Sequence, residues 1–138
     1  MLERTACHGT CPAYSVEVRR DGTVVFQGNN FVRVHGTVCA SIPKPKAAAL
    51  FDEASRAHLS ALKPSYRIPI TDNPSATVTL QLAGAAAVAI EDYPPCHTED
   101  PRTPAALCKL EKSIDRVAGT STWITCQAAD GGTGDCSP

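Results

Sequence analysis

Short segments in which apolar and polar residues alternate are the feature that most constrains the fold of this chain. Residues 14–18 alternate strictly, the period-two pattern of a strand with one buried face. Asp21-Gly22 then supplies a two-residue hairpin turn into a second strand at 24–27, and after a break at 28–30 a third strand is expected at 31–40. The first forty residues therefore predict a three-stranded antiparallel meander.

The rest of the chain predicts two helices around a second pair of strands. Apolar residues recur at intervals of three and four over 44–60, which places them on one helical face. Residues 77–82 and 87–93 alternate again and predict two strands. A second helix is expected after Thr103 at the cap and Pro104 at the first position, and it should end at Gly119.

Each predicted strand and helix has one apolar face, so the simplest arrangement is one sheet covered by both helices. The expected fold class is α+β: an antiparallel sheet of about five strands with two helices packed on one face, in the order βββ-α-ββ-α. A chain of 138 residues is the size of one domain. We expect that domain at residues 1–125 and a Gly- and Asp-rich tail at 126–138.

Charge and hydropathy exclude two classes of partner. The formal net charge is −1, and the basic residues are scattered rather than gathered into a stripe, so we expect no nucleic-acid partner. The longest apolar stretch, at 85–90, falls far short of the roughly 18 residues that cross a bilayer. The expected partner is therefore an unknown protein or another envelope component, bound by a chain without a transmembrane segment.

Seven cysteines are many for a reduced cytosolic protein of this size, and they indicate disulfides that supplement a core. We therefore expect an exported protein, in the periplasm, at the cell surface or secreted. Residues 1–6 have no apolar signal region, so we expect the chain to begin after a removed leader. A lipoprotein reading of Cys7 is disfavoured by Arg4, which stands where such signals usually carry leucine.

The cysteine spacings suggest which thiols pair. A structural disulfide is the favoured reading of Cys7 and Cys11, because Gly9 permits a tight loop between them. A metal site that adds His8 and perhaps His97, and a redox-active pair, remain alternatives. Nearest-neighbour pairing would close two further loops, Cys96 with Cys108 and Cys126 with Cys136. Cys39 is then left over, and it is interpreted as a free, buried thiol in preference to a partner in an intermolecular disulfide.

Zinc is the alternative cofactor, since cysteine and histidine are its usual ligands. The candidate ligands are Cys7, His8, Cys11 and His97, with Cys96 and Cys108 as further donors. The chain contains no C-x-x-C or H-x-x-x-H pair of the spacing that structural zinc sites use. The expectation is therefore no cofactor, with zinc as the alternative.

Other polar and aromatic residues allow competing interpretations. Asp72, in Thr71-Asp72-Asn73-Pro74, is interpreted as a turn residue in preference to a general base. The acidic set Glu91, Asp92, Glu99 and Asp100 is interpreted as solvated surface in preference to a weak calcium site. Core or rim packing is the usual role of aromatic residues, but a groove lined by Tyr14, Tyr66, Asp72 and Trp123 is the alternative.

Several of these motifs together resemble a bacterial family of unknown function. They are Cys7-x-Gly9-x-Cys11-Pro12-x-Tyr14, Asp21-Gly22-Thr23-Val24, Gly28, Tyr66, Thr71-Asp72-x-Pro74, Glu91-Asp92-Tyr93 and Trp123. The resemblance covers roughly residues 3–125, and it implies an exported or lipoprotein-type domain without implying a reaction. Cys39, Cys96, Cys108, Cys126 and Cys136 fall outside these motifs.

These observations favour a non-enzymatic exported domain of the cell envelope, a structural or interaction module tied by disulfides. No nucleophile elbow, phosphate-binding glycine loop or catalytic triad is present in the sequence. The alternative is a metal-binding protein or envelope enzyme whose site gathers Cys7, His8, Cys11, Tyr66 and Asp72.

Overall fold

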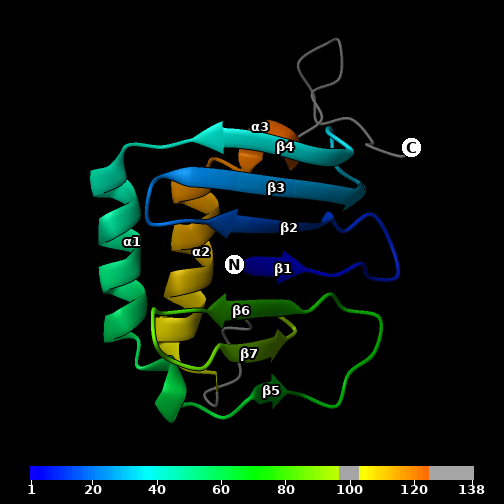
Figure 1. Cartoon of the computed structure of the whole chain (residues 1–138). Helices are drawn as coiled ribbons and strands as arrows, with labels where there is room; N and C mark the ends of the chain where they lie inside the picture. Colours follow the sequence, from blue (N-terminus) through cyan, green and yellow to red (C-terminus); the bar gives the residue numbers. More distant parts are fainter. Residues whose placement is uncertain (97–102, 125–138) are drawn as a thin grey trace.

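The computed structural model describes residues 1–96 and 103–124 as one mixed sheet with helices packed against it (Figure 1). The sheet has seven strands in the order β4-β3-β2-β1-β6-β7-β5. The strands are β1 (Leu2–Arg4), β2 (Ala13–Val18), β3 (Thr23–Asn30), β4 (Gly36–Ser41), β5 (Ser65–Arg67), β6 (Ala76–Leu80) and β7 (Val88–Tyr93). The helices are α1 (Lys44–Arg56), the 3-10 helix η1 (Leu59–Ala61), α2 (Ala105–Ala118) and α3 (Ser121–Ile124).

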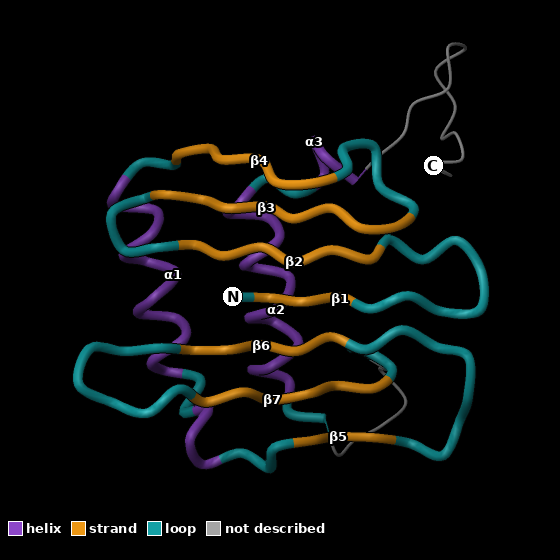
Figure 2. The backbone as a smooth tube through the Cα atoms, turned by 45° about the vertical axis from the view of Figure 1, so that its right-hand side comes forward, coloured by secondary structure: helices purple, strands orange, loops and turns teal. Residues whose placement is uncertain are grey.

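The long helices α1 and α2 lie side by side on the same face of the sheet, as Figure 2 shows from a second direction. Alternate residues of every long strand point toward these helices, as the period-two pattern predicts. Each fully buried large apolar side chain contributes roughly 1.5–3 kcal/mol. The core between the layers includes Leu2, Val16, Phe26, Val78, Ile90, Leu50, Leu107 and Leu110. The predicted α+β class and the placement of two helices on one face are confirmed.

The strand count and order differ from the prediction because two strands have only three residues each. Strand β1 pairs antiparallel with both β2 and β6, and so occupies the middle of the sheet. Strand β5 pairs parallel with β7 at the edge. Three residues are too few to show a periodicity, so neither strand is visible as a pattern in the sequence.

Strand β3 also continues where a break was predicted. It runs through Gly28 to Asn30, and the following strand begins only at Gly36. A Cβ atom at position 28 would lie 2.0 Å from the carbonyl oxygen of Val34, because the loop after β3 folds closely over this glycine. Gly28 therefore serves a close approach of two backbone segments rather than a turn.

The helix ends partly match the sequence signals. Gly119 closes α2 in the left-handed conformation, with φ 74°, as predicted. Helix α1 ends at Arg56 rather than near residue 60, and His58, with φ 48°, separates it from η1. The N-cap of α2 is Pro104 without a side-chain hydrogen bond, whereas the Thr103 hydroxyl donates to Asp92 on β7.

Candidate functional site

Two loops that are far apart in the sequence meet at one end of the sheet. The loop between β1 and β2 contains Cys7 and Cys11, and the segment between β5 and β6 contains Thr71 and Asp72; both are on the right-hand side of Figure 1. The amide of His8 donates a hydrogen bond of 3.1 Å to the carbonyl oxygen of Asp72. We call residues 7–11 and 71–73 together the loop pair.

Hydrogen bonds next to β1 and β6 hold the loop pair in register. The Thr5 amide donates to the carbonyl oxygen of Ser75 at 3.0 Å, and the Ser75 amide donates to the Thr5 hydroxyl at 2.9 Å. These bonds continue the β1–β6 ladder by one residue beyond Arg4 and Ala76. The two loops are therefore positioned by the sheet itself, the rigid scaffold on which functional loops are usually built.

A disulfide closes the first loop. Cys7 and Cys11 are bonded through their sulfur atoms, and their Cα atoms are 5.6 Å apart, within the normal range for a disulfide. Gly9 between them has φ 145°, a conformation that side chains disfavour. In this state neither thiol is available to a metal ion, so a zinc site on Cys7, Cys11 and His8 would require the reduced protein.

The side chains of the loop pair are turned to solvent. His8, Thr71, Asp72 and Asn73 are all exposed. Asp72 adopts φ 66° and accepts a hydrogen bond of 3.1 Å from the Thr71 hydroxyl, while the Asn73 amide side chain donates to the Thr71 carbonyl oxygen. These contacts are those of the turn expected for Thr71-Asp72-Asn73-Pro74, and they fix a polar surface.

The four residues considered for a groove do not come together. Tyr14 is 2% exposed and its ring packs 5.4 Å from that of Phe26, which in turn packs 5.0 Å from Trp123. Tyr66 lies on β5 at the opposite edge of the sheet, where its hydroxyl accepts a hydrogen bond from the Lys63 amide. The rings of Tyr14 and Trp123 thus serve packing. Asp72 lies apart from them, against the Cys7–Cys11 loop.

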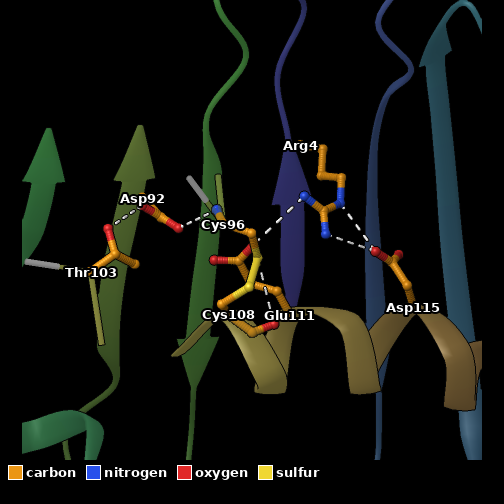
Figure 3. Close-up of a disulfide and its surroundings, with 7 residues drawn as sticks. All are labelled: Arg4, Asp92, Cys96, Thr103, Cys108, Glu111 and Asp115. Carbon is orange, nitrogen blue, oxygen red and sulfur yellow. Dashed lines mark hydrogen bonds and ion pairs between the residues drawn. A yellow bond between two sulfur atoms is a disulfide. The ribbon is translucent and has the colours of Figure 1, made fainter. Parts of the chain in front are cut away.

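A second disulfide joins the end of β7 to the first turn of α2. The sulfur atoms of Cys96 and Cys108 are 2.19 Å apart, and both residues are half-buried. Figure 3 shows the disulfide above α2, beside a row of ionisable side chains between helix and sheet. This buried row consists of Arg4, Asp92, Glu111 and Asp115. The Oε2 atom of Glu111 lies 3.5 Å from the Cys96 sulfur and 3.6 Å from Nη1 of Arg4, so the carboxyl contacts both groups.

Arg4 on β1 links this row to the core. Its Nε and Nη2 atoms donate to Oδ2 of Asp115 at 3.1 and 2.9 Å, and its Nη1 atom is 3.6 Å from Oε2 of Glu111. Asp115 also accepts from the hydroxyls of Tyr14 at 2.7 Å and Thr120 at 2.9 Å. Both carboxylate oxygens of Asp115 therefore accept hydrogen bonds, and the Arg4 guanidinium contacts the carboxyl groups of Asp115 and Glu111.

Glu111 is the least satisfied member of the row. Its side chain is 0% exposed, and its Oε1 atom has no hydrogen-bond partner among the residues that the structure describes. Burial raises the pKa of Glu111 to about 8; the nearby Arg4 guanidinium lowers it, and the Asp92 and Asp115 carboxylates raise it. The carboxyl is therefore mainly protonated at neutral pH.

Asp92 is buried rather than solvated. It is 1% exposed, which makes the prediction of a solvated surface wrong for this residue. Its Oδ2 accepts the Cys96 amide at 2.7 Å and its Oδ1 accepts the Thr103 hydroxyl at 3.2 Å. The alternation of β7 explains the burial, because Asp92 shares the helix-facing side with Val88 and Ile90.

Asp92, Cys96 and Glu111 bring one potential ligand atom each within 4.8 Å of one another. The Cys96 sulfur is bonded to Cys108, however, and Glu111 is mainly protonated, so the disulfide form lacks the charged donor set that a cation needs. In this state the cluster is an ionisable network around a disulfide rather than a metal centre.

Cys39 differs from its prediction, and Cys126 and Cys136 lie outside the described residues. Cys39 is a free thiol in the described part of the chain, but it is exposed, so the prediction of a buried thiol is wrong. It stands on the edge strand β4 between Val38 and Ala40, which point to the core. His97, Glu99, Asp100, Cys126 and Cys136, and with them the Cys126–Cys136 pairing and the tail, lie outside the described residues.

The buried row has a signal in the sequence, namely charged residues at positions where the helix and strand patterns predict apolar ones. Glu111 falls on the apolar stripe of its helix with Leu107 and Ile114, and Arg4 is in phase with the buried Leu2. A charged residue at a core-phase position of a helix or strand indicates a buried polar network, since such residues are rarely buried unless paired.

The fold and the loop pair define a disulfide-bonded α+β domain. A family model described as "Domain of unknown function (DUF6438)" matches residues 1–118, and the chain belongs to that family. No curated protein and no solved structure shows significant similarity to it.

Proposed function

We propose that this protein is an exported domain of the bacterial cell envelope that binds another envelope component and does not catalyse a reaction. The loop pair would be its contact surface. The observation that carries this proposal is the convergence of two motif segments, around Cys7 and Asp72, on one exposed surface.

The disulfides support the exported location. Both Cys7–Cys11 and Cys96–Cys108 are closed, and such bonds persist in oxidising compartments such as the periplasm. Among the described residues, no helix combines the length and apolar character that a membrane span requires. Export fits these two properties together.

The loop pair has the properties of a preformed binding surface. The Cys7–Cys11 bond and the hydrogen bond from His8 to Asp72 fix the backbone before any partner arrives. Ordering a loop on binding costs affinity, so a loop ordered in advance binds more tightly. His8, Thr71 and Asp72 offer an imidazole, a hydroxyl and a carboxylate to a polar partner.

The location is tested by expressing the complete gene in the source organism and trapping free thiols with an alkylating agent before fractionation. Non-reducing peptide mapping should find the protein in the envelope or secreted fraction with both disulfides closed. A cytosolic protein with alkylated Cys7 and Cys11 would contradict the proposal. Stoichiometric zinc bound to free thiols would instead favour the metal alternative.

The contact surface is tested by placing a photo-crosslinking residue at position 8 or 72, with Asp52 on α1 as an exposed control position. Irradiation in cells should yield the same crosslinked product from positions 8 and 72 and none from position 52. Equal products from all three positions, or products from position 52 alone, would show that the loop pair is not the binding surface.

A further inference from the structure

Glu111 is not part of the proposed binding surface, yet its carboxyl is buried in a position that destabilises the folded protein. Its side chain is 0% exposed and its Oε1 atom has no hydrogen-bond partner among the described residues. Leaving such a group buried without a hydrogen-bond partner destabilises the folded protein. An apolar residue would be expected on this stripe of α2, between Leu107 and Ile114, if packing were the only requirement.

The neighbour of Glu111 suggests what the carboxyl is for. Its Oε2 atom lies 3.5 Å from the sulfur of Cys96. A disulfide sulfur has no hydrogen to donate, so this contact offers little while the bond is closed. When Cys96 is a thiol or thiolate, the same distance allows a hydrogen bond between sulfur and carboxyl. The arrangement thus serves the reduced state of the disulfide.

We propose that Cys96–Cys108 is a thiol–disulfide exchange site that reacts with a dithiol, and that Glu111 donates the proton to Cys96 when the bond opens. The dithiol is either a small molecule or the active-site pair of a protein reductant. This inference is independent of the loop pair, which lies on other segments of the chain.

The exchange proceeds in two balanced steps. One thiolate of the dithiol attacks the Cys108 sulfur, so that a mixed disulfide forms, the bond to Cys96 breaks, and the departing Cys96 thiolate takes the proton of Glu111. The second thiol of the reductant then loses its proton to water and attacks the reductant's other sulfur, so that the two reductant sulfurs become bonded and the bond to Cys108 breaks. The reductant leaves as a cyclic disulfide, Cys108 is released and protonated, and Glu111 regains a proton from water.

The positions of the two cysteines support this assignment of roles. Cys96 is the sulfur in contact with Glu111, and its amide is held by Asp92 at 2.7 Å, so the leaving group is fixed beside the acid. Cys108 lies in the first turn of the 14-residue helix α2, where the helix dipole stabilises the thiolate released in the second step.

The charged groups around Glu111 set the pH at which it can act. Arg4 faces it from β1 at 3.6 Å, Asp92 faces it from β7, and Asp115 lies one turn along α2. Burial, together with the excess of carboxyl groups over the single guanidinium, raises the pKa of Glu111 to about 8. Glu111 is therefore protonated and uncharged at neutral pH, and it loses its proton in mild alkali.

The test is to reduce the intact protein with dithiothreitol between pH 6.5 and 9.5, quench with acid, alkylate, and follow each disulfide by mass spectrometry. Rates are divided by the concentration of dithiothreitol thiolate. A positioned acid commonly contributes ~10²–10⁴-fold, and because a thiolate is already a fair leaving group we expect about tenfold here. The corrected rate at Cys96–Cys108 should fall about tenfold across pH 8, while that at Cys7–Cys11 stays constant.

Substitutions assign the effect to Glu111. Glu111→Gln should lower the corrected rate at pH 6.5 by about tenfold and remove its pH dependence. Glu53→Gln, on α1 and bonded to Ser113, is the matched control and should keep the wild-type profile. Glu111→Asp retains an acid and should keep a pH-dependent rate, which serves as the second variant if Glu111→Gln does not fold.

Three results would each overturn the proposal. One is a disulfide that opens only when the protein unfolds, as judged by circular dichroism during the reduction. Another is the same corrected pH profile at both disulfides. The third is a folded Glu111→Gln variant whose corrected reduction rate at Cys96–Cys108 depends on pH as in the wild type, which would show that the carboxyl takes no part in the reaction.

Discussion

Replacing Tyr14 by phenylalanine isolates the free energy held in the Arg4–Asp115 network. Only the hydroxyl is removed, and the ring keeps its contact with Phe26. That hydroxyl donates to Asp115 at 2.7 Å and accepts from Arg4 at 3.1 Å, so one strong charge-assisted bond and one weaker bond disappear.

The expected loss in the free energy of unfolding is about 2 kcal/mol, since hydrogen bonds to charged groups are worth about 1.5–3 kcal/mol and this network is partly open to solvent. Asp115 keeps Arg4 and Thr120 as partners, which limits the loss. For a chain of this size the melting temperature should fall by about 6 °C. The assay is urea unfolding under non-reducing conditions, in which the midpoint should move while the slope stays constant.

Tyr66→Phe is the matched control, because the Tyr66 hydroxyl accepts a hydrogen bond of 3.1 Å from the exposed, uncharged Lys63 amide. Its cost should be about 0.5 kcal/mol, the lower end for a neutral hydrogen bond. If Tyr14→Phe cost no more than Tyr66→Phe, the charged network would not contribute to stability and the reasoning from its geometry would be refuted.

Three further predictions follow from burial, loop length and backbone contact. Because folded Glu111 has a pKa near 8 and unfolded glutamate one near 4.5, the folded state holds an extra proton between these values. The contribution of Glu111 to the free energy of unfolding should be fully present below pH 4.5 and fall by up to about 5 kcal/mol as the pH rises from 4.5 through 8, and Glu111→Gln should remove this component from the pH dependence of unfolding. Serine replacement of the Cys96–Cys108 disulfide should lower the free energy of unfolding by about 3 kcal/mol and that of Cys7–Cys11 by about 2 kcal/mol, because closing the longer loop removes more entropy from the unfolded chain. The reverse order in denaturant titration would contradict this. Gly28→Ala should cost about 3 kcal/mol because its Cβ would meet backbone, whereas Gly84→Ala, in open space with φ 74°, should cost only about 1 kcal/mol; equal melting temperatures would contradict the steric argument.

The elements that the sequence predicted are those with enough residues to show a period. Strand β2, strand β7 and helix α2 each repeat their pattern over at least six residues. The two three-residue strands have no such repeat, and their pairing depends on residues ten or more positions away in the chain. Local pattern therefore revealed the layers but not the order of strands within the sheet.

The candidate site was predictable only in part, for the same reason. The Cys7–Cys11 bond lies within a single loop, and glycine between the cysteines indicates it. The buried row, by contrast, takes Arg4, Asp92 and Glu111 from three distant segments. Each shows in the sequence only as a charge at a core-phase position, and nothing local indicates that the three meet.

Among the strands that the structure describes, β1 alone pairs with both halves of the sheet, the meander β2–β3–β4 and the group β6–β7–β5. A chain in which residues 1–6 were cut away would therefore expose two unpaired strand edges that face each other, and such edges favour aggregation. A synthetic peptide of these residues should fill the gap and restore the fold. The domain is thus suited to a split reporter, in which a very short tag completes a large partner.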